Sequence, residues 1–375
     1  MVSPAFATSI VVLGDLEGNG QKFDQFVQTS GAFEKDGFTM RPGYRFVFMG
    51  DSVDRGPSSM RILDTLIALK KQYPSQVVLI IGNRDANKLA FRWMFQGDGE
   101  DPTRMKTFLR AVNAPDAFEY RRQELAANGL ADDDMAVFES LKGDLAPDGR
   151  MTQYLAHAQV AYIDEDSGGI FVHGGISDKG LGYVPGHFSP ITDVRQWVKT
   201  LNDWAQSRPR ELFAYQRPQP QSVIYQRSLD LTNNPQLPPD FVVRSLQSQG
   251  IHYLAVGHTP VGDLPVVLSA KDFRMVMTDN SYSRAGTSSW TRIEDSQIKF
   301  GGQMIDIKFD SHLPILGDSA IGSLSYDGWR RVGNLESECL EWQIQGRHRA
   351  VYRLDATACE QRPLKKSWFQ QFLGI

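Results

Sequence analysis

The 375-residue sequence contains only two cysteines, Cys339 and Cys359. Neither a disulfide scaffold nor a thiolate zinc site is therefore expected. No apolar run approaches the length that crosses a bilayer, and the mean hydropathy is −0.34, so we predict no membrane insertion. The 40 Lys and Arg residues nearly balance the 44 Asp and Glu residues, which argues against binding to nucleic acid. The first residues lack the basic region of a secretory signal, and we expect a cytoplasmic protein.

The composition is otherwise that of a globular protein, with 41% hydrophobic residues. In the first third of the chain, strands and helices are expected to alternate. The pattern predicts strands at 9–13, 44–48 and 77–81 and helices over 21–33 and 58–73. The three strands end in Gly-Asp, Gly-Asp and Gly-Asn. Because ligand sites in α/β sheets lie beyond the carboxyl ends of strands, this repetition indicates a site.

We expect residues 1–375 to form a single domain of the α/β class, because the polar motifs are spread over about two thirds of the chain. Within that domain, the pattern indicates a helical insertion at about 86–157. The segment 183–240 is rich in proline and is predicted to be a loop-rich cover. A C-terminal β-rich segment of antiparallel strands is expected at about 300–375.

Five short polar motifs follow one another along the chain. They are Gly14-Asp15-Leu16-Glu17-Gly18, Gly50-Asp51-Ser52-Val53-Asp54-Arg55-Gly56, Gly82-Asn83-Arg84-Asp85, His173-Gly174-Gly175 and Gly257-His258-Thr259-Pro260. Taken singly, each has an ordinary explanation, because Gly-Asp after a strand is a common turn and a lone histidine usually serves packing. Five in order, all carrying side chains that ligate metals, favour a metal site instead.

Together these motifs resemble those of the calcineurin-like metallophosphoesterases, especially the phosphoprotein-phosphatase branch, over residues 10–282. The resemblance implies a four-layer α/β/β/α sandwich with two adjacent divalent metal ions at the strand ends. Such a pair of ions activates a water for attack on a phosphate ester and holds the phosphate oxygens. Mapped residue by residue, the resemblance implies the first-metal ligands Asp15 and Glu17, the bridging ligand Asp51, and the second-metal ligands Asn83, His173 and His258.

Substrate binding is assigned to arginines and to one tyrosine. Arg55 lies in the Asp-Arg-Gly motif, and a guanidinium grips two phosphate oxygens at once. Arg227 resembles a later phosphate-binding arginine of the family's bacterial-like members, with an ordinary surface arginine as the alternative. Tyr282 stands where relatives often place a tyrosine near the site, and simple packing is the alternative there.

Two positions depart from the family's usual motifs. Glu17 replaces a histidine, so the first metal would have only anionic oxygen donors. We therefore expect Mn²⁺, with Mg²⁺ as the alternative, over Zn²⁺ or iron. Arg84 replaces the histidine that is the family's general acid, and a guanidinium does not release a proton near neutral pH. Asp54, which would orient that histidine, is predicted to form an ion pair with Arg84.

Asp54, Arg55 and Arg84 are the predicted catalytic residues, and three interpretations of Arg84 stay open. Arg84 stabilises charge on the phosphate while water or another group protonates the leaving group; a histidine of the cover, such as His187, supplies the proton; or the protein is an inactive binder. The complete ligand set favours activity. Bacterial members of the branch, including some secreted into host cells, resemble this Asp-x-Glu and Asn-Arg pattern, and delivery of this chain to a host stays open.

The predicted function is metal-dependent hydrolysis of phosphomonoesters of phosphoproteins, at Ser/Thr or Tyr, with a phosphorylated protein or peptide as partner. One alternative is a hydrolase of dinucleoside polyphosphates or other nucleotides, and another is a phosphopeptide-binding module without turnover. Aromatic residues of the insertion and the cover are candidates for stacking on a base or a phosphotyrosine ring, with core packing as the more common role. They are Phe91, Trp93, Phe95, Phe188, Trp197 and Trp204.

Overall fold

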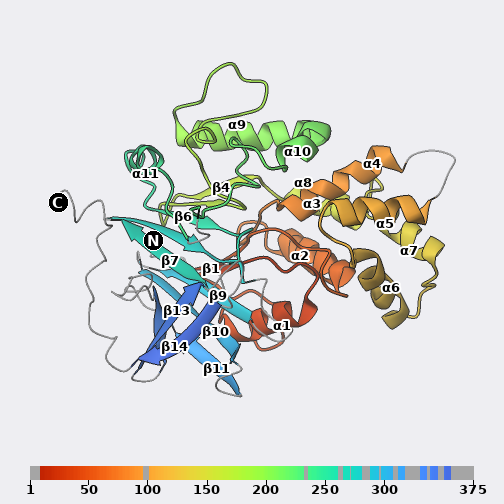
Figure 1. The fold of residues 1–375 in the computed structure, drawn as a ribbon, viewed down its shortest axis with the longest axis horizontal. Helices are drawn as coiled ribbons and strands as arrows, with labels where there is room; N and C mark the ends of the chain where they lie inside the picture. The colour runs from red at the N-terminus through yellow and green to blue at the C-terminus, as the bar shows by residue number, and fades with distance from the viewer. Residues whose placement is uncertain are drawn as a thin grey trace, which may run out of the picture.

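The computed structural model describes residues 9–95, 101–231, 235–260, 265–270, 272–280, 288–294, 297–306, 311–316, 330–335, 338–344 and 350–355, with side chains as far as residue 301. Two β-sheets form its centre, and helices pack against them (Figure 1). Tyr282 lies outside the described residues, so its predicted role is not addressed by the structure.

The first sheet has nine strands in the order β14-β13-β12-β11-β10-β9-β1-β2-β3. Its parallel part consists of β1 (Ser9–Leu13), β2 (Tyr44–Phe48) and β3 (Val77–Leu79). β1 is buried along its whole length, as expected of a strand that is covered on both faces. The antiparallel part comprises β9 (Ser288–Glu294), β10 (Gln297–Asp306), β11 (Ser311–Leu316), β12 (Arg330–Leu335), β13 (Glu338–Ile344) and β14 (Ala350–Asp355). The predicted C-terminal antiparallel segment is thus an extension of the first sheet.

The second sheet has five strands in the order β4-β5-β6-β8-β7. Its three central strands, β5 (Gly169–Val172), β6 (Tyr253–Val256) and β8 (Phe273–Met277), are parallel. The edge strands β4 (Ala161–Asp164) and β7 (Val266–Ala270) pair antiparallel with their neighbours. Both sheets therefore have a parallel part whose strand ends are available for a site.

Helices pack against each sheet from outside. α1 (Gly20–Thr29) contacts β9, α2 (Ser59–Gln72) contacts β3, and α9 (Val194–Ser207) contacts β4. The predicted helical insertion consists of α3 (Asn83–Asn87), α4 (Phe91–Met94), α5 (Pro102–Ala111), α6 (Ala117–Ala127), α7 (Asp134–Gly143) and α8 (Arg150–His157). The remaining helices are α10 (Pro209–Tyr215) and α11 (Asp240–Gln247).

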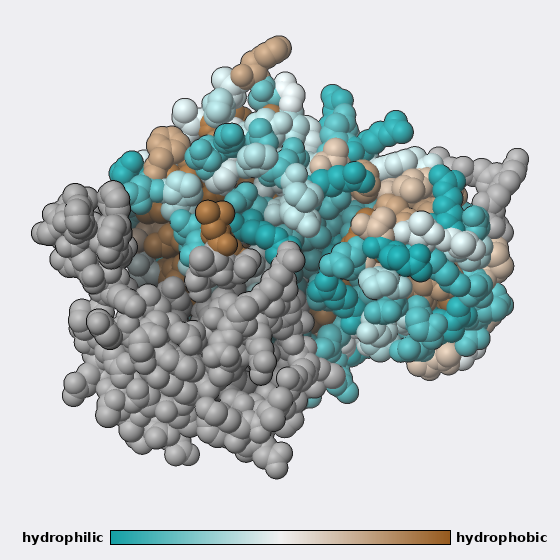
Figure 2. All heavy atoms as spheres, in the orientation of Figure 1, coloured by the Kyte–Doolittle hydropathy of each residue, from teal (hydrophilic) through white to brown (hydrophobic). Residues whose placement is uncertain are grey.

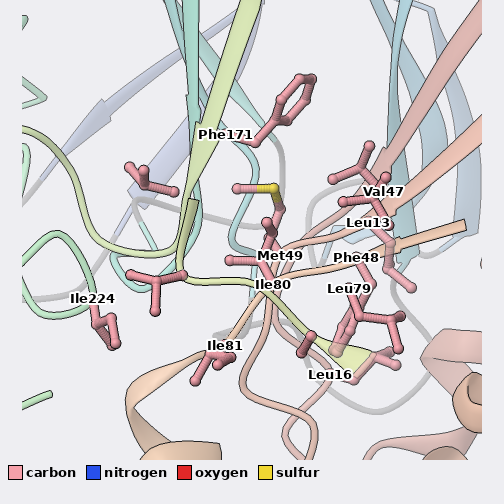
Figure 3. Close-up of a cluster of buried hydrophobic side chains, with 14 of the residues drawn as sticks. Leu13, Leu16, Val47, Phe48, Met49, Leu79, Ile80, Ile81, Phe171 and Ile224 are labelled. Atoms are coloured by element: carbon pink, nitrogen blue, oxygen red, sulfur yellow. The ribbon is translucent and has the colours of Figure 1, made fainter. Parts of the chain in front are cut away.

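The hydrophobic core joins the two sheets. Figure 3 shows Leu13, Val47 and Phe48 of the first sheet in one cluster with Met49 and with Phe171 of the second sheet. All five side chains are fully buried, and burial of a side chain of this size contributes ~1.5–3 kcal/mol. The layered α/β sandwich predicted from the motifs is confirmed.

The prediction of a loop-rich cover at 183–240 was wrong in part, because this segment contains α9 and α10. Val194, Trp197, Val198 and Leu201 are buried at helical spacing along α9. Pro209 does not interrupt a helix, because it is the first residue of α10, where a missing N–H is tolerated. The prolines of this segment therefore occur at the start of a helix as well as in loops.

The surface in Figure 2 is largely hydrophilic over the helical insertion. None of the helices in the described part of the chain is long and apolar enough to cross a membrane.

Candidate metal centre

The loops after five parallel strands bring the predicted ligands together. Asp15, Asp51 and Asn83 follow β1, β2 and β3, while His173 and His258 follow β5 and β6. The backbone N–H of His258 donates to Asp15 Oδ1 at 3.1 Å, and His173 Nε2 lies 3.2 Å from Asn83 Oδ1. Residues that are far apart in the sequence and belong to different sheets thus meet at one edge.

The backbone is unusual at these same loops. Five non-glycine residues of the described chain have a positive φ, and four of them belong to the motifs: Glu17 (49°), Asp51 (55°), Asp54 (100°) and His258 (63°). Such conformations cost of order 1–3 kcal/mol each and persist where the surrounding structure holds them, commonly at functional sites. The rest of the fold therefore holds these loops in a strained backbone arrangement.

Three of the predicted ligands fit a divalent cation. One ligand atom each from Asp51, His173 and His258 lies within 4.8 Å of the others, and all three residues are buried. His258 Nε2 is buried without a hydrogen-bond partner among the described residues. A buried nitrogen without a partner is costly, and a cation beside it would remove that cost.

Charge and burial set the protonation of this group. Burial alone would lower the pKa of His173, but the carboxylates of Asp51 and Asp15 raise it to about 10. Burial lowers the pKa of His258 well below its usual value. Burial would raise the pKa of Asp51, but His173 and Arg84 hold it below the usual range. Asp51 is therefore an anion and His258 a neutral imidazole, which are the forms that bind metal ions. His173 carries a proton in the metal-free protein and would release it on binding an ion.

Glu17 lies at the same edge, but its carboxylate is held by two arginines. Arg84 Nε donates to Glu17 Oε1 at 2.7 Å, and Arg55 Nη1 donates to the same oxygen at 2.9 Å. Glu17 is not a member of the three-residue group that fits a cation. Its assignment as a metal ligand stays a prediction, as does that of Asp15 and Asn83.

Asp54 has a closer partner than the predicted one. Arg84 Nη1 lies 3.8 Å from Asp54 Oδ2, whereas Lys88 Nζ lies 2.5 Å and 2.6 Å from the two Asp54 oxygens. Lys88 and Asp54 are both buried. The expected Asp54–Arg84 pair is therefore the weaker of two contacts, because a lysine one helical turn after Arg84 reaches Asp54 first.

Asp85 connects the loops that follow β2 and β3. Its side chain accepts hydrogen bonds from the backbone N–H groups of Gly82, Asp51 and Ser52, each at 2.9 Å. Ser52 Oγ also donates to Asp85 at 2.6 Å. Burial raises the pKa of Asp85 to about 6. Asp85 thus fixes the backbone from which Asp51 projects.

A cavity of about 810 Å³ opens beside these residues. The predicted site residues that line it are Glu17, Asp51, Arg55, Asn83, Arg84, Arg227 and His258. His187, offered above as a proton donor, is exposed and does not line this cavity. Among the aromatic candidates, Phe91, Phe95 and Trp197 are buried in the core, and Phe188 is fully exposed. The cavity therefore contains the predicted arginines and none of these four aromatic side chains.

Sequence reasoning assigned no role to Asp85, Lys88 and Asn113, which bind the predicted site residues Asp51, Asp54 and Arg84. Asp85 belongs to a quoted motif but was given no role, and Lys88 follows Arg84 at the i, i+4 spacing that places side chains on one helix face. These two could have been found from spacing. Asn113, whose carbonyl accepts a hydrogen bond from Arg84 Nη1 at 3.3 Å, had no signal in the sequence, because only the folded insertion brings it there.

Curated relatives match only part of the chain. The serine/threonine-protein phosphatase 6 catalytic subunit of Drosophila melanogaster is 32% identical over 83 residues, which are 22% of this chain and 25% of that protein. Serine/threonine-protein phosphatase PP1-1 of Saccharomyces cerevisiae is 30% identical over 82 residues, which are 22% of this chain and 24% of that protein. The match thus spans about a quarter of the length of these relatives.

A solved structure, the cold-active protein-tyrosine phosphatase of a psychrophilic Shewanella species, aligns with a TM-score of 0.48 and 14% identity, over 82% of this chain and 80% of that one. Residues 8–262 match the family described as calcineurin-like phosphoesterase. This match covers more than half of the chain and includes all five motifs. The chain belongs to the calcineurin-like phosphoesterase family.

Proposed function

We propose that this protein is a metal-dependent phosphatase that hydrolyses phosphomonoesters of phosphoproteins with a water activated by two divalent ions. One juxtaposition carries the proposal: the cation-binding group of Asp51, His173 and His258 lies at the same edge of the fold as the guanidinium groups of Arg55 and Arg84. A cation site supplies the nucleophile, and guanidinium groups match the charge of a phosphate. The serine/threonine phosphatases among the relatives support a phosphoprotein substrate.

The proposed site residues form two groups, one that holds the metal ions and one that binds the phosphate. Those that would hold the ions are Asp15, Glu17, Asp51, Asn83, His173 and His258. Bound ions of this kind supply an activated water and neutralise part of the phosphate charge. The residues that would bind and orient the phosphate are Arg55, Arg84 and Arg227, which line one cavity. Mn²⁺ is the proposed metal, because carboxylate oxygens predominate among the donors assigned to the first ion.

The protonation state of Arg84 affects which phosphate esters we expect the protein to cleave. Burial alone would lower its pKa, but the carboxylates of Glu17, Asp51 and Asp54 raise it above the usual value. Arg84 therefore keeps its proton and does not replace the missing general acid. Assistance by a general acid is worth ~10²–10⁴ in rate. Its loss affects alkyl esters such as phosphoserine most, and aryl esters such as phosphotyrosine least, because their leaving group is less basic.

The test is a substrate panel on metal-free protein with added Mn²⁺. The panel contains p-nitrophenyl phosphate, a phosphotyrosine peptide, a phosphoserine peptide and diadenosine tetraphosphate. We expect Mn²⁺-dependent turnover of the first two, with kcat/KM for the phosphoserine peptide at least about 10-fold lower. Turnover of the nucleotide alone would support the nucleotide hydrolase instead, and absence of all turnover would support a binding module.

One variant tests whether the turnover measured in this panel comes from this protein or from a contaminating phosphatase. Asp51→Asn keeps the shape of the side chain but removes the negative charge that lies nearest His173 Nε2, at 3.4 Å. Mutation of a residue that only supports a metal ligand typically lowers metal affinity or activity about 10–100-fold. Loss of a ligand itself should therefore reduce kcat/KM at least about 100-fold. Near-normal activity of Asp51→Asn would contradict the assigned metal centre.

A further inference from the structure

A second cavity adjoins the one that holds the proposed phosphate site. Its volume is about 380 Å³, and it shares Glu17, Arg55 and Asn113 with the larger cavity. One wall comes from the motif loops and the start of α1, and the opposite wall comes from the connection between α5 and α6 and from the start of α6. The residues of this opposite wall are Asn113, Ala114, Pro115, Asp116 and Tyr120.

The polar groups that the motif loops and α1 contribute to this cavity already have partners within the protein. The Asn19 side chain accepts a hydrogen bond from the N–H of Lys22 at 3.0 Å, and Lys22 Nζ donates to the carbonyl of Asp15 at 2.5 Å. Asp54 is bound by Lys88, and Glu17 is bound by the two arginines, as described above. These groups form a fixed surface and are not free to bind a charged ligand.

The insertion wall differs, because its polar side chains are free. Within the described part of the chain, the side chains of Asn113, Asp116 and Tyr120 have no hydrogen bond or ion pair. Asp116 stands at the N-cap position of α6, yet its side chain makes no capping hydrogen bond, and the residue is exposed. An amide, a carboxylate and a phenol therefore line this cavity from the turn after α5 and the start of α6, and only the carboxylate carries a charge.

The turn at Asn113 explains how this wall reaches the site. Asn113 is the fifth non-glycine residue with a positive φ, at 59°. Its N–H donates to Arg110 at 3.1 Å, and the N–H of Ala114 donates to Leu109 at 2.8 Å. This is the pattern that ends a helix with a left-handed residue, usually glycine and sometimes asparagine. The turn directs the Asn113 carbonyl to Arg84 and places the residue in the walls of both cavities.

We propose that the second cavity is a subsite for the polypeptide next to the phosphorylated residue, and that Asp116 selects a basic side chain there. The inference rests on the proposed phosphatase function. A substrate that ends at its phosphorylated group needs only the larger cavity, whereas a peptide extends past Arg55 into the smaller one. An exposed carboxylate without an ionic partner pairs with lysine or arginine, and Tyr120 and Asn113 offer hydrogen bonds to the peptide backbone.

The test uses phosphopeptides that differ in a single residue, arginine or glutamate, at successive positions on either side of the phosphorylated residue. For the wild-type protein with Mn²⁺, we expect one position at which arginine raises kcat/KM by about 2- to 5-fold over glutamate, as for a partly exposed ion pair. Asp116→Asn should bring this ratio close to one, since asparagine is an equally good N-cap residue. Asp116→Arg should reverse the preference.

Asp148→Asn is the matched control, because Asp148 is an exposed aspartate of the same insertion that lines neither cavity. It should keep the wild-type ratio. Equal kcat/KM for the arginine and glutamate peptides at every position, or a preference that survives Asp116→Arg, would overturn the inference. If the wild-type protein does not hydrolyse p-nitrophenyl phosphate at all, the proposed function fails instead, so the two failures are distinguishable.

Discussion

At the scale of the residue, Arg84 is near three carboxylates but contacts only one closely. Its Nε lies 2.7 Å from Glu17 and 3.5 Å from Asp51, and its Nη1 lies 3.8 Å from Asp54. Lys88 neutralises Asp54, so Arg84 remains paired with Glu17 beside the cavity. Lys88 thus leaves Arg84 available to Glu17, although Lys88 itself lines neither the larger cavity nor the smaller one.

Lys88→Met should destabilise the protein, because it leaves the buried carboxylate of Asp54 with only the more distant Arg84. Removal of one partner of a buried ion pair typically costs about 3–5 kcal/mol. Urea unfolding of Lys88→Met, Asp54→Asn and the double variant measures this cost as a cycle. We expect the double variant to lose less stability than the sum of the single variants. Additive losses would mean that the two side chains do not interact.

At the scale of the element, the turn after β3 depends on the absence of a side chain at position 82. A Cβ at Gly82 would lie 2.2 Å from both the backbone nitrogen and Oδ1 of Asp51. Gly82→Ala should therefore displace Asp51 and lower kcat/KM at least about 10-fold, as a small misplacement of catalytic groups does. Steady-state kinetics with p-nitrophenyl phosphate and Mn²⁺ measures this effect.

Gly143→Ala is the control for this prediction. Gly143 ends α7, and a Cβ there would meet no atom within 4 Å. This variant should keep its activity and gain up to about 1 kcal/mol of stability from the better helix propensity of alanine. Equal activity of the two variants would show that the close approach of Gly82 to Asp51 is not required.

Elements with a strong local pattern could be predicted from the sequence, and those made by distant contacts could not. The predicted strand at 9–13 coincides with β1, whose apolar run is short and ends at glycine. The helix predicted over 21–33 ends at Thr29 instead, because Gly31 follows the C-cap Ser30 with a φ of 77°, and Phe33 then forms a bridge with Met40. β7 was missed, since it is a short edge strand whose last two residues are exposed. Its place in the sheet depends on pairing with β8.

The candidate site shows the same division. The residues of the motifs were found because glycine, carboxylate and imidazole recur beside one another in the sequence. The partners of those residues were not found, because Asn113 reaches Arg84 only through the packing of the insertion. Every residue has a backbone carbonyl, so a role that depends on this group cannot be predicted from the identity of the side chain.

At the scale of the whole molecule, a bound cation should stabilise the fold, because its ligands come from both sheets and are separated in the unfolded chain. A ligand at 100 times its Kd contributes about 2.7 kcal/mol. We expect Mn²⁺ to raise the Tm of metal-free protein by several degrees, measured by differential scanning calorimetry, and EDTA to reverse the shift. Asp51→Asn should show a smaller rise. A Tm that is independent of Mn²⁺ would argue against a metal site in the native state.

The division of the ligands between the sheets also bears on biosynthesis. Asp15, Asp51 and Asn83 are translated before the helical insertion, and His173 and His258 after it. A nascent chain that has left the ribosome only as far as α8 carries the predicted carboxylate and amide ligands but neither of the predicted imidazole ligands. The proposed hydrolytic activity therefore requires synthesis to continue past His258, and we expect a translation product that ends at α8 to lack it.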